Sequence, residues 1–245
     1  MPYLDRGGVR IAYERAGNDG AGGGLPLLLS HGFGASARMW KPNLAALAAG
    51  RPVITWDMRG HGRSDDPPDQ AEYTQDACVA DMVAVLDACG ADRAVLGGLS
   101  LGGYLSLAFW LAHPERVAAL LLFDTGPGFR SDEARRRWNE RALATASRAA
   151  ASPSGRPGLA NAARGMLTQH DARVIDSLPS VDVPVLVLVG GDDAPFLGAA
   201  EYVAAKIPGA EHVVIPGAGH ASNADQPELF NRHVLAFLGR LAPPR

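Results

Sequence analysis

Short runs of apolar residues recur along the chain and alternate with longer segments of helical periodicity. Six runs rich in valine, isoleucine and leucine show little alternation of apolar and polar positions, as expected for strands buried on both faces of a parallel sheet. These runs cover residues 25–30, 52–57, 92–98, 117–123, 183–189 and 211–216. Helical segments are predicted at 37–49, 74–89, 101–112, 197–207 and 226–240. Residues 7–16 alternate more regularly and predict an antiparallel edge strand. The whole pattern predicts an α/β fold, with helices flanking a mostly parallel sheet.

One interval, residues 126–180, contains no run with the character of a strand. Residues 131–150 predict a helix that has acidic side chains in its first turn, where the helix dipole favours negative charge. The segment 151–158 is rich in proline, glycine and serine and separates this helix from a second predicted one. We therefore expect 126–180 to form a short helical cap, inserted into a core domain made of residues 1–125 and 181–245.

The composition is that of a globular protein and argues against two classes of partner. Of 245 residues, 47% are hydrophobic and 20% are charged, and the formal net charge is −3. Basic residues are not gathered into the concentrated positive field that phosphate binding needs, so we expect no nucleic-acid partner. No apolar run approaches the roughly 20 residues that span a bilayer, so we expect no membrane insertion. A homo-oligomer is compatible with this composition.

The two cysteines bear on the cellular compartment. Cys78 and Cys89 lie eleven residues apart on one predicted helix, about 16 Å along its axis. A disulfide needs Cα atoms within roughly 7 Å, so both thiols are expected to be reduced. Reduced thiols, together with a first segment that lacks the basic and apolar regions of a signal peptide, favour a cytoplasmic location.

A G-x-S-x-G motif stands at the carboxyl end of the run 92–98, where ligands bind in open parallel sheets. It consists of Gly98, Ser100 and Gly102 and leads directly into a predicted helix. A sharp turn from strand to helix would strain the backbone of Ser100 and expose its Oγ, and a side chain at either glycine would collide with neighbouring backbone. We therefore predict Ser100 as a nucleophile. A glycine-rich turn with a capping serine is the alternative.

A serine hydroxyl needs a base to remove its proton and an acid to orient that base. His220 follows the last predicted strand in a loop and is the predicted base. Asp193 follows the run 183–189 and is the predicted acid, with Asp192 and Asp124 as alternatives. The order serine, aspartate, histidine along the chain is that of the nucleophile-elbow hydrolases, and it differs from the orders in chymotrypsin-like and subtilisin-like enzymes.

Two backbone N–H groups are expected to face the carbonyl oxygen that becomes negative during acyl transfer. One belongs to Leu101, directly after the nucleophile, and the other to Phe33, in a loop where glycines allow the backbone to approach a ligand. The remaining candidates for the walls of the substrate pocket are Gly32, Leu99, Trp138 and Phe196. His31 is expected to brace the Phe33 loop by hydrogen bonds.

No metal or cofactor is predicted. Asp57, Arg59 and His61 could imitate a metal site, but no other ligand cluster accompanies them, and a salt-bridged supporting loop is the preferred interpretation. The chain has neither the phosphate-cradling nor the dinucleotide-binding glycine motif. Four arginines of the predicted cap helix either form a solvated face or attract acidic substrates: Arg135, Arg136, Arg137 and Arg141.

Five blocks of sequence resemble the α/β-hydrolase superfamily over nearly the whole chain. They are HGFGAS at 31–36, DMRGHGRSD at 57–65, GLSLGG at 98–103, GGDDAPF at 190–196 and GAGHASNADQPELF at 217–230. In that family the acid usually follows the strand that 183–189 occupies here, which supports Asp193. The resemblance implies a serine esterase-like member. The insertion 126–180 departs from the family's pattern, because the cap of that family is usually longer, and we therefore expect a more open active site.

These features predict a serine hydrolase that cleaves carboxylic esters of small or medium acyl chains through an acyl-enzyme intermediate. An aspartate at position 100 would indicate the dehalogenases and epoxide hydrolases of the same fold, and serine argues against both. The alternatives that keep the triad are a lactonase, a C–C bond hydrolase and a cofactor-free perhydrolase resembling bacterial haloperoxidases. A non-enzymatic small-molecule receptor is a further alternative, which a short cap disfavours.

Overall fold

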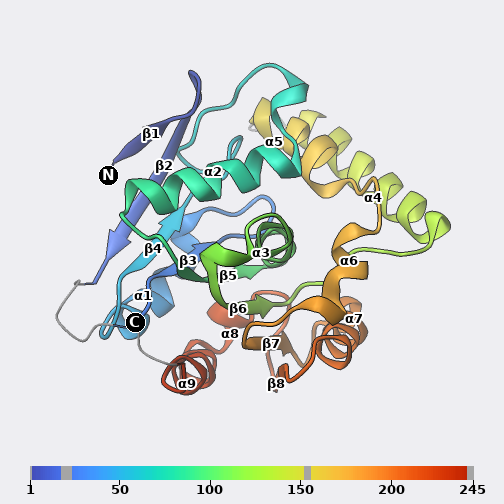
Figure 1. Cartoon of the computed structure of the whole chain (residues 1–245). Coiled ribbons are helices and arrows are strands. Elements are labelled where there is room, and N and C mark those ends of the chain that lie inside the picture. The colour runs from blue at the N-terminus through green and yellow to red at the C-terminus, as the bar shows by residue number, and fades with distance from the viewer. Residues whose placement is uncertain (1, 18–23, 152–155, 242–245) are drawn as a thin grey trace.

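The computed structural model describes residues 2–17, 24–151 and 156–241. Within these residues a single sheet has the strand order β1-β2-β4-β3-β5-β6-β7-β8 (Figure 1). Its strands are β1 (Tyr3–Asp5), β2 (Arg10–Ala16), β3 (Leu27–Ser30), β4 (Val53–Trp56), β5 (Ala94–Leu99), β6 (Val117–Phe123), β7 (Val185–Gly190) and β8 (Glu211–Ile215). The strands β3 to β8 pair with one another in parallel. Strand β2 pairs antiparallel with both β1 and β4. The predicted α/β fold is therefore confirmed.

Each helical segment that the sequence predicts contains a helix. The helices are α1 (Lys41–Leu47), α2 (Gln75–Ala88), α3 (Leu101–Ala112), α4 (Asp132–Ala151), α5 (Pro157–Ala162), α6 (Arg173–Ser177), α7 (Ala194–Lys206), α8 (Ser222–Asp225) and α9 (Pro227–Leu238). Among them, α6 and α8 are helices that the sequence did not predict. Short 3₁₀ turns occupy Ala37–Trp40, Gln70–Glu72, Pro114–Arg116 and Leu178–Ser180, and Ala163–Leu167 is π-helical. Helix α7 begins three residues before the predicted start at 197. Pro195 lies in its first turn, where proline is tolerated because that N–H has no partner within the helix.

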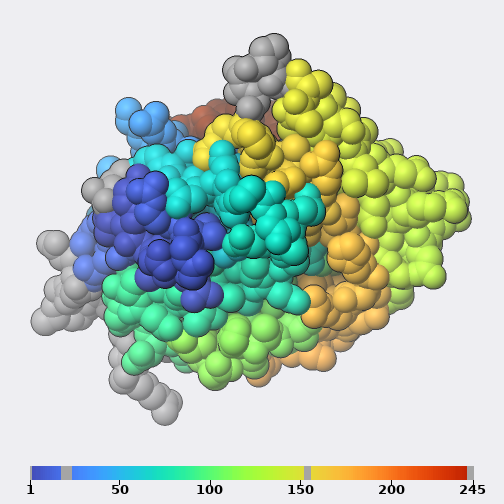
Figure 2. Space-filling view, turned by 90° about the horizontal axis from the view of Figure 1, so that it is seen from above, coloured from blue at the N-terminus to red at the C-terminus, as the bar shows by residue number. Residues whose placement is uncertain are grey.

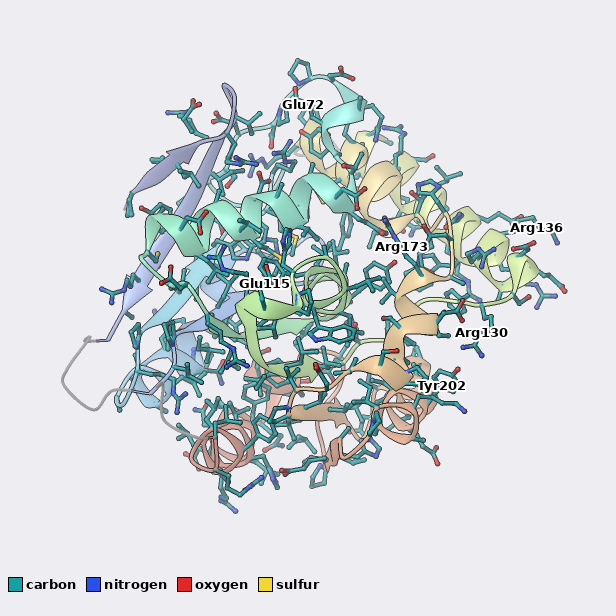
Figure 3. The ribbon with its side chains drawn as sticks, in the orientation of Figure 1. Glu72, Glu115, Arg130, Arg136, Arg173 and Tyr202 are labelled. Carbon is teal, nitrogen blue, oxygen red and sulfur yellow. The ribbon has the colours of Figure 1, made fainter. Side chains whose placement is uncertain are left out.

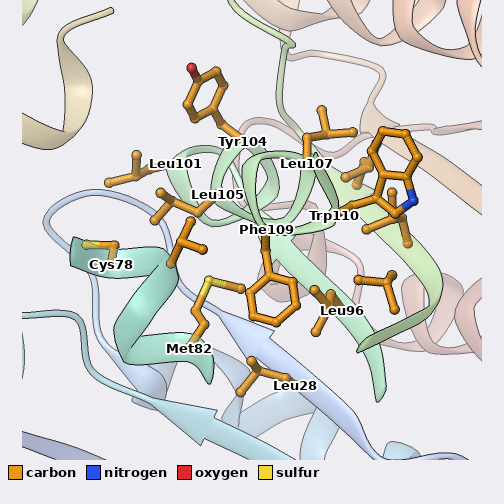
Figure 4. Packing of buried hydrophobic residues seen from close by; sticks show 14 of the residues in the cluster. Leu28, Cys78, Met82, Leu96, Leu101, Tyr104, Leu105, Leu107, Phe109 and Trp110 are labelled. Carbon is orange, nitrogen blue, oxygen red and sulfur yellow. The ribbon is translucent and has the colours of Figure 1, made fainter. Parts of the chain in front are cut away.

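Helices cover both faces of the sheet. On one face α2, α3 and α7 contribute residues to one apolar cluster, in which Leu28 of β3 and Leu96 of β5 lie near Phe109 of α3 (Figure 4). On the other face α1 and α9 pack against the strands, and Leu27 lies in one cluster with Phe230. Neighbouring residues of a strand point to opposite faces. Both faces are buried here, which explains why the strand sequences are apolar at nearly every position.

The segment between β6 and β7 carries α4, α5, the π-helical turn and α6. Helix α4 packs against α5 and the π-helical turn, and α4 forms one margin of the molecule (Figures 1 and 2). The predicted second helix of this segment is thus divided into α5 and the π-helical turn. The predicted break at 151–158 lies partly outside the described residues. The division into a core and a cap domain stays a prediction.

Two further expectations are that both cysteines are reduced and that no segment inserts into a membrane. Cys78 is buried and Cys89 is half-buried, and neither forms a disulfide in the part of the chain that the structure describes. Each helix in that part is too short or too polar to cross a bilayer.

Candidate active site

Ser100 occupies the sharp turn between β5 and α3. Its backbone has φ 56° and ψ −115°, in a region that residues with a side chain rarely adopt. Such a conformation costs on the order of 1–3 kcal/mol and persists only where the surrounding structure holds it. Two contacts hold it here: the N–H of Ser100 donates to the carbonyl of Phe123 (2.9 Å), and Thr125 Oγ1 donates to the carbonyl of Ser100 (2.6 Å).

The two motif glycines are required by close backbone approaches. A Cβ on Gly98 would fall on the carbonyl group of Gly102, and a Cβ on Gly102 would fall on the carbonyl oxygen of Ser30. The start of α3 therefore lies directly against the ends of β3 and β5. This packing presents Ser100 at the N-terminus of α3, where unpaired N–H groups and the helix dipole favour negative charge.

His220 and Asp193 form a hydrogen-bonded pair at the same edge of the sheet. His220 Nδ1 lies 2.8 Å from Asp193 Oδ2, and the ring of Phe196 stacks on the imidazole with centroids 4.7 Å apart. The Asp193 side chain is 4% exposed and the His220 side chain 44% exposed. Because Nδ1 donates to the carboxylate, Nε2 is left as the nitrogen that can accept a proton from the pocket side.

The predicted pocket residues share two adjoining cavities. Ser100 and His220 line a cavity of about 430 Å³ with Gly32, Phe33, Leu99, Trp138 and Phe196. Ser100 also lines a second cavity of about 290 Å³, which includes Leu101 and Tyr104. The structure therefore brings together the residues that the sequence singled out, and Asp193 contacts this group through His220.

The alternative acids occupy different places. Asp192 is exposed. Asp124 is fully buried at the end of β6 with a positive φ of 46°. Its Oδ1 accepts from the N–H of Gly190 (2.7 Å), and its Oδ2 accepts from the hydroxyl of Ser222. Burial raises the pKa of Asp124 to about 6. Through these hydrogen bonds Asp124 connects the ends of β6 and β7 with the segment after His220. The sequence pattern did not indicate this function.

The loop after β3 approaches the nucleophile through its backbone. A Cβ on Gly32 would lie 3.6 Å from the Cβ of Ser100. His31 braces this loop: its Nε2 accepts from the N–H of Met58 (3.0 Å), so its Nδ1 carries the proton and donates to the carbonyl of Gly32 (2.7 Å). Burial lowers the pKa of His31. The N–H of Leu101 opens α3 and has no acceptor within that helix.

The loop after β4 is held by ion pairs. Asp57 accepts from the N–H of Ala37 (2.6 Å) and pairs with Arg63 (3.1 Å). Arg59 is buried and makes two contacts of 2.8 Å with Asp81. His61 packs edge-on to the ring of Phe33. The described residues contain no group of three or more acidic, histidine or cysteine side chains that could hold a metal ion.

The sequence and fold of the chain are similar to those of known hydrolases. Residues 26–158 match the family model described as the alpha/beta hydrolase fold. The chain is 25% identical to the enol-lactonase from Burkholderia xenovorans LB400, covering 98% of this chain and 100% of that one, with a TM-score of 0.82. It is 30% identical to a hydrolase from Pseudomonas aeruginosa PA01, with coverages of 97% and 98% and a TM-score of 0.83. It is 33% identical to a thermophilic esterase from Thermogutta terrifontis, with coverages of 98% and 99% and a TM-score of 0.81.

Proposed function

The chain belongs to the alpha/beta hydrolase family, and on this premise we propose that it is a serine hydrolase that cleaves carboxylic esters of small or medium acyl chains. The observation that carries the proposal is the hydrogen bond of 2.8 Å between Asp193 and His220 beside a cavity that His220 shares with Ser100. The strained backbone of Ser100 supports it, because such strain persists at functional turns.

In the proposed mechanism Ser100 Oγ attacks the ester carbonyl carbon while His220 Nε2 takes the hydroxyl proton. The N–H groups of Phe33 and Leu101 stabilise the negative charge on the carbonyl oxygen. The C–O bond of the ester breaks, and the alcohol leaves with the proton from His220. Water then gives a proton to His220 and attacks the acyl-enzyme. The acid leaves as Ser100 Oγ recovers that proton. Asp193 keeps the imidazole in the required tautomer throughout.

The cavity walls support small or medium acyl groups. Phe33, Trp138 and Phe196 give apolar surface beside the nucleophile, and the volumes of about 430 and 290 Å³ are those of sites for small molecules. A lactonase is the second candidate, favoured by the similarity to an enol-lactonase over the whole chain. The steps are the same for a lactone, except that the leaving alcohol stays tethered to the acyl group.

The proposal is tested with 4-nitrophenyl esters of two to eight acyl carbons and with a set of lactones. We expect repeated turnover of the short esters, and Ser100→Ala should lower kcat by about 10³ or more. Ser106→Ala is the matched control, since it removes a hydroxyl that bonds within α3 to the carbonyl of Gly102. Unchanged turnover in Ser100→Ala would contradict the proposal. If each protein molecule reacts with the ester only once, leaving the acyl group on Ser100, the result would favour a non-enzymatic small-molecule receptor.

A further inference from the structure

The arginines of α4 differ in their partners. Arg135 contacts Asp132 and two carbonyls of the preceding loop, Arg136 lies 3.9 Å from Glu140, and Arg137 pairs with Glu133. Across the part of the chain that the structure describes, the guanidinium of Arg141 has no acidic or carbonyl partner. One cation of the four is thus left available for a ligand.

Arg141 lies on the face of α4 that borders the candidate active site. Trp138, Arg141, Ala142 and Thr145 line the same cavity as Ser100, at the spacing of three, four and seven residues that places side chains on one face of a helix. Arg141 also lines the second cavity beside Ser100. Arg136 points away from the body of the molecule (Figure 3), and its side chain is 70% exposed.

No carboxylate faces Arg141 in the two cavities beside Ser100. Among the described residues that line either of these two cavities, none is aspartate or glutamate. Arg141 also borders a third cavity that contains Glu133, and Glu133 is paired with Arg137. The carboxylate nearest to the proposed chemistry, Asp193, is buried and bonded to His220. Trp138 and Phe196 give this cavity apolar walls beside Arg141, and Arg141 itself is exposed, so that its guanidinium is accessible to a ligand. A guanidinium in such a setting favours a carboxylate, which it can bind through two parallel hydrogen bonds.

We propose that Arg141 binds a carboxylate carried by the substrate, so that the preferred substrates are esters with a second, ionised carboxyl group. This inference rests on the proposed function and specifies its substrate class. Arg141 borders both cavities, so the carboxylate can belong to the acyl or to the alcohol part of the ester. The reaction is still cleavage of the ester C–O bond through an acyl-enzyme on Ser100, and the carboxylate bound by Arg141 does not react.

Matched esters that differ in charge test the proposal. For the acyl side, mono-4-nitrophenyl adipate is compared with its neutral methyl-capped diester; for the alcohol side, 4-acetoxybenzoate is compared with its methyl ester. We expect kcat/KM to favour the charged ester about tenfold in at least one pair. Arg141→Gln should lower that ratio towards one, and Arg141→Glu should lower it further. Arg136→Gln removes the same charge from the same helix and should keep the wild-type ratio.

A binding measurement separates this inference from the proposed function. Adipate should bind to Ser100→Ala, which cannot turn over, and about tenfold more weakly once Arg141→Gln is added. If both ester pairs give a ratio near one, or if Arg136→Gln lowers the ratio as much as Arg141→Gln does, carboxylate recognition by Arg141 is overturned. If no ester is hydrolysed but adipate binding depends on Arg141, the proposed function fails and the carboxylate site stands.

Discussion

Among single residues, the buried carboxylate of Asp193 has the most specific consequence for activity. We predict that Asp193→Asn lowers kcat by on the order of 10⁴, because an amide holds the imidazole in the wrong tautomer and does not stabilise the imidazolium that forms. Asp192→Asn is the matched control, since it neutralises an exposed carboxylate one residue earlier. Steady-state hydrolysis of a 4-nitrophenyl ester by both folded variants measures the difference.

Near-wild-type turnover in Asp193→Asn would move the orienting function to another acid. Asp124 is then the candidate to examine, because it is buried at the end of β6 and its oxygens reach the segment that follows His220. The double variant Asp124→Asn with Asp193→Asn would show whether the remaining activity depends on Asp124.

The residues of the proposed triad could be predicted from the sequence because each follows an apolar run at the carboxyl edge of the sheet. Asp124 was placed there too, but its partners were not predictable. Its bond to Ser222 joins residues 98 positions apart, and its backbone has a positive φ; no local pattern encodes either feature. From the sequence, Arg141 could not be distinguished from the other three arginines of α4. Ion pairs depend on the directions of side chains, which the spacing of charges along the chain does not fix.

At the scale of elements, two helical glycines offer a matched comparison. A Cβ on Gly102 of α3 would fall on the carbonyls of Ser30 and His31, whereas a Cβ on Gly198 of α7 meets nothing within 4 Å. We predict that Gly102→Ala destabilises the protein by about 3 kcal/mol or more through overpacking. Gly198→Ala should stabilise it by up to about 1 kcal/mol, since alanine favours a helix interior. Urea unfolding measures both, and equal effects would contradict the close approach of α3 to the sheet.

The elements best predicted from the sequence are those buried on several sides. The bounds of β6 and α3 coincide with the predicted runs, since both are apolar along almost their whole length. Strand β1 has three residues and exists through pairing with β2, so it carries no pattern of its own. The π-helical turn Ala163–Leu167 departs from the 3.6-residue period on which helix prediction relies.

For the molecule as a whole, two buried groups couple stability to pH with opposite signs. Burial lowers the pKa of His61 from 6.5 to about 3, so its contribution to stability is present above pH 6.5 and is lost as the pH falls towards 3. Burial raises the pKa of Asp124 from 3.8 to about 6, so its contribution is present below pH 3.8 and is lost as the pH rises through 6. Between pH 4 and 6 the two contributions oppose each other.

This opposition predicts the slopes of three variants. Each group changes the free energy of unfolding by up to about 1.4 kcal/mol per pH unit between pH 4 and 6. In His61→Gln the free energy of unfolding should fall less steeply on acidification than in the wild type, by about that amount per pH unit. In Asp124→Asn it should fall more steeply than in the wild type. The double variant should return to a slope near that of the wild type. Urea unfolding at half-unit steps from pH 4 to 7 measures the slopes, which do not depend on the constant cost of each substitution. Parallel curves for all four proteins would show that neither group keeps its shifted pKa in the folded state, and that the burial of His61 and Asp124 is relieved by water or by local opening.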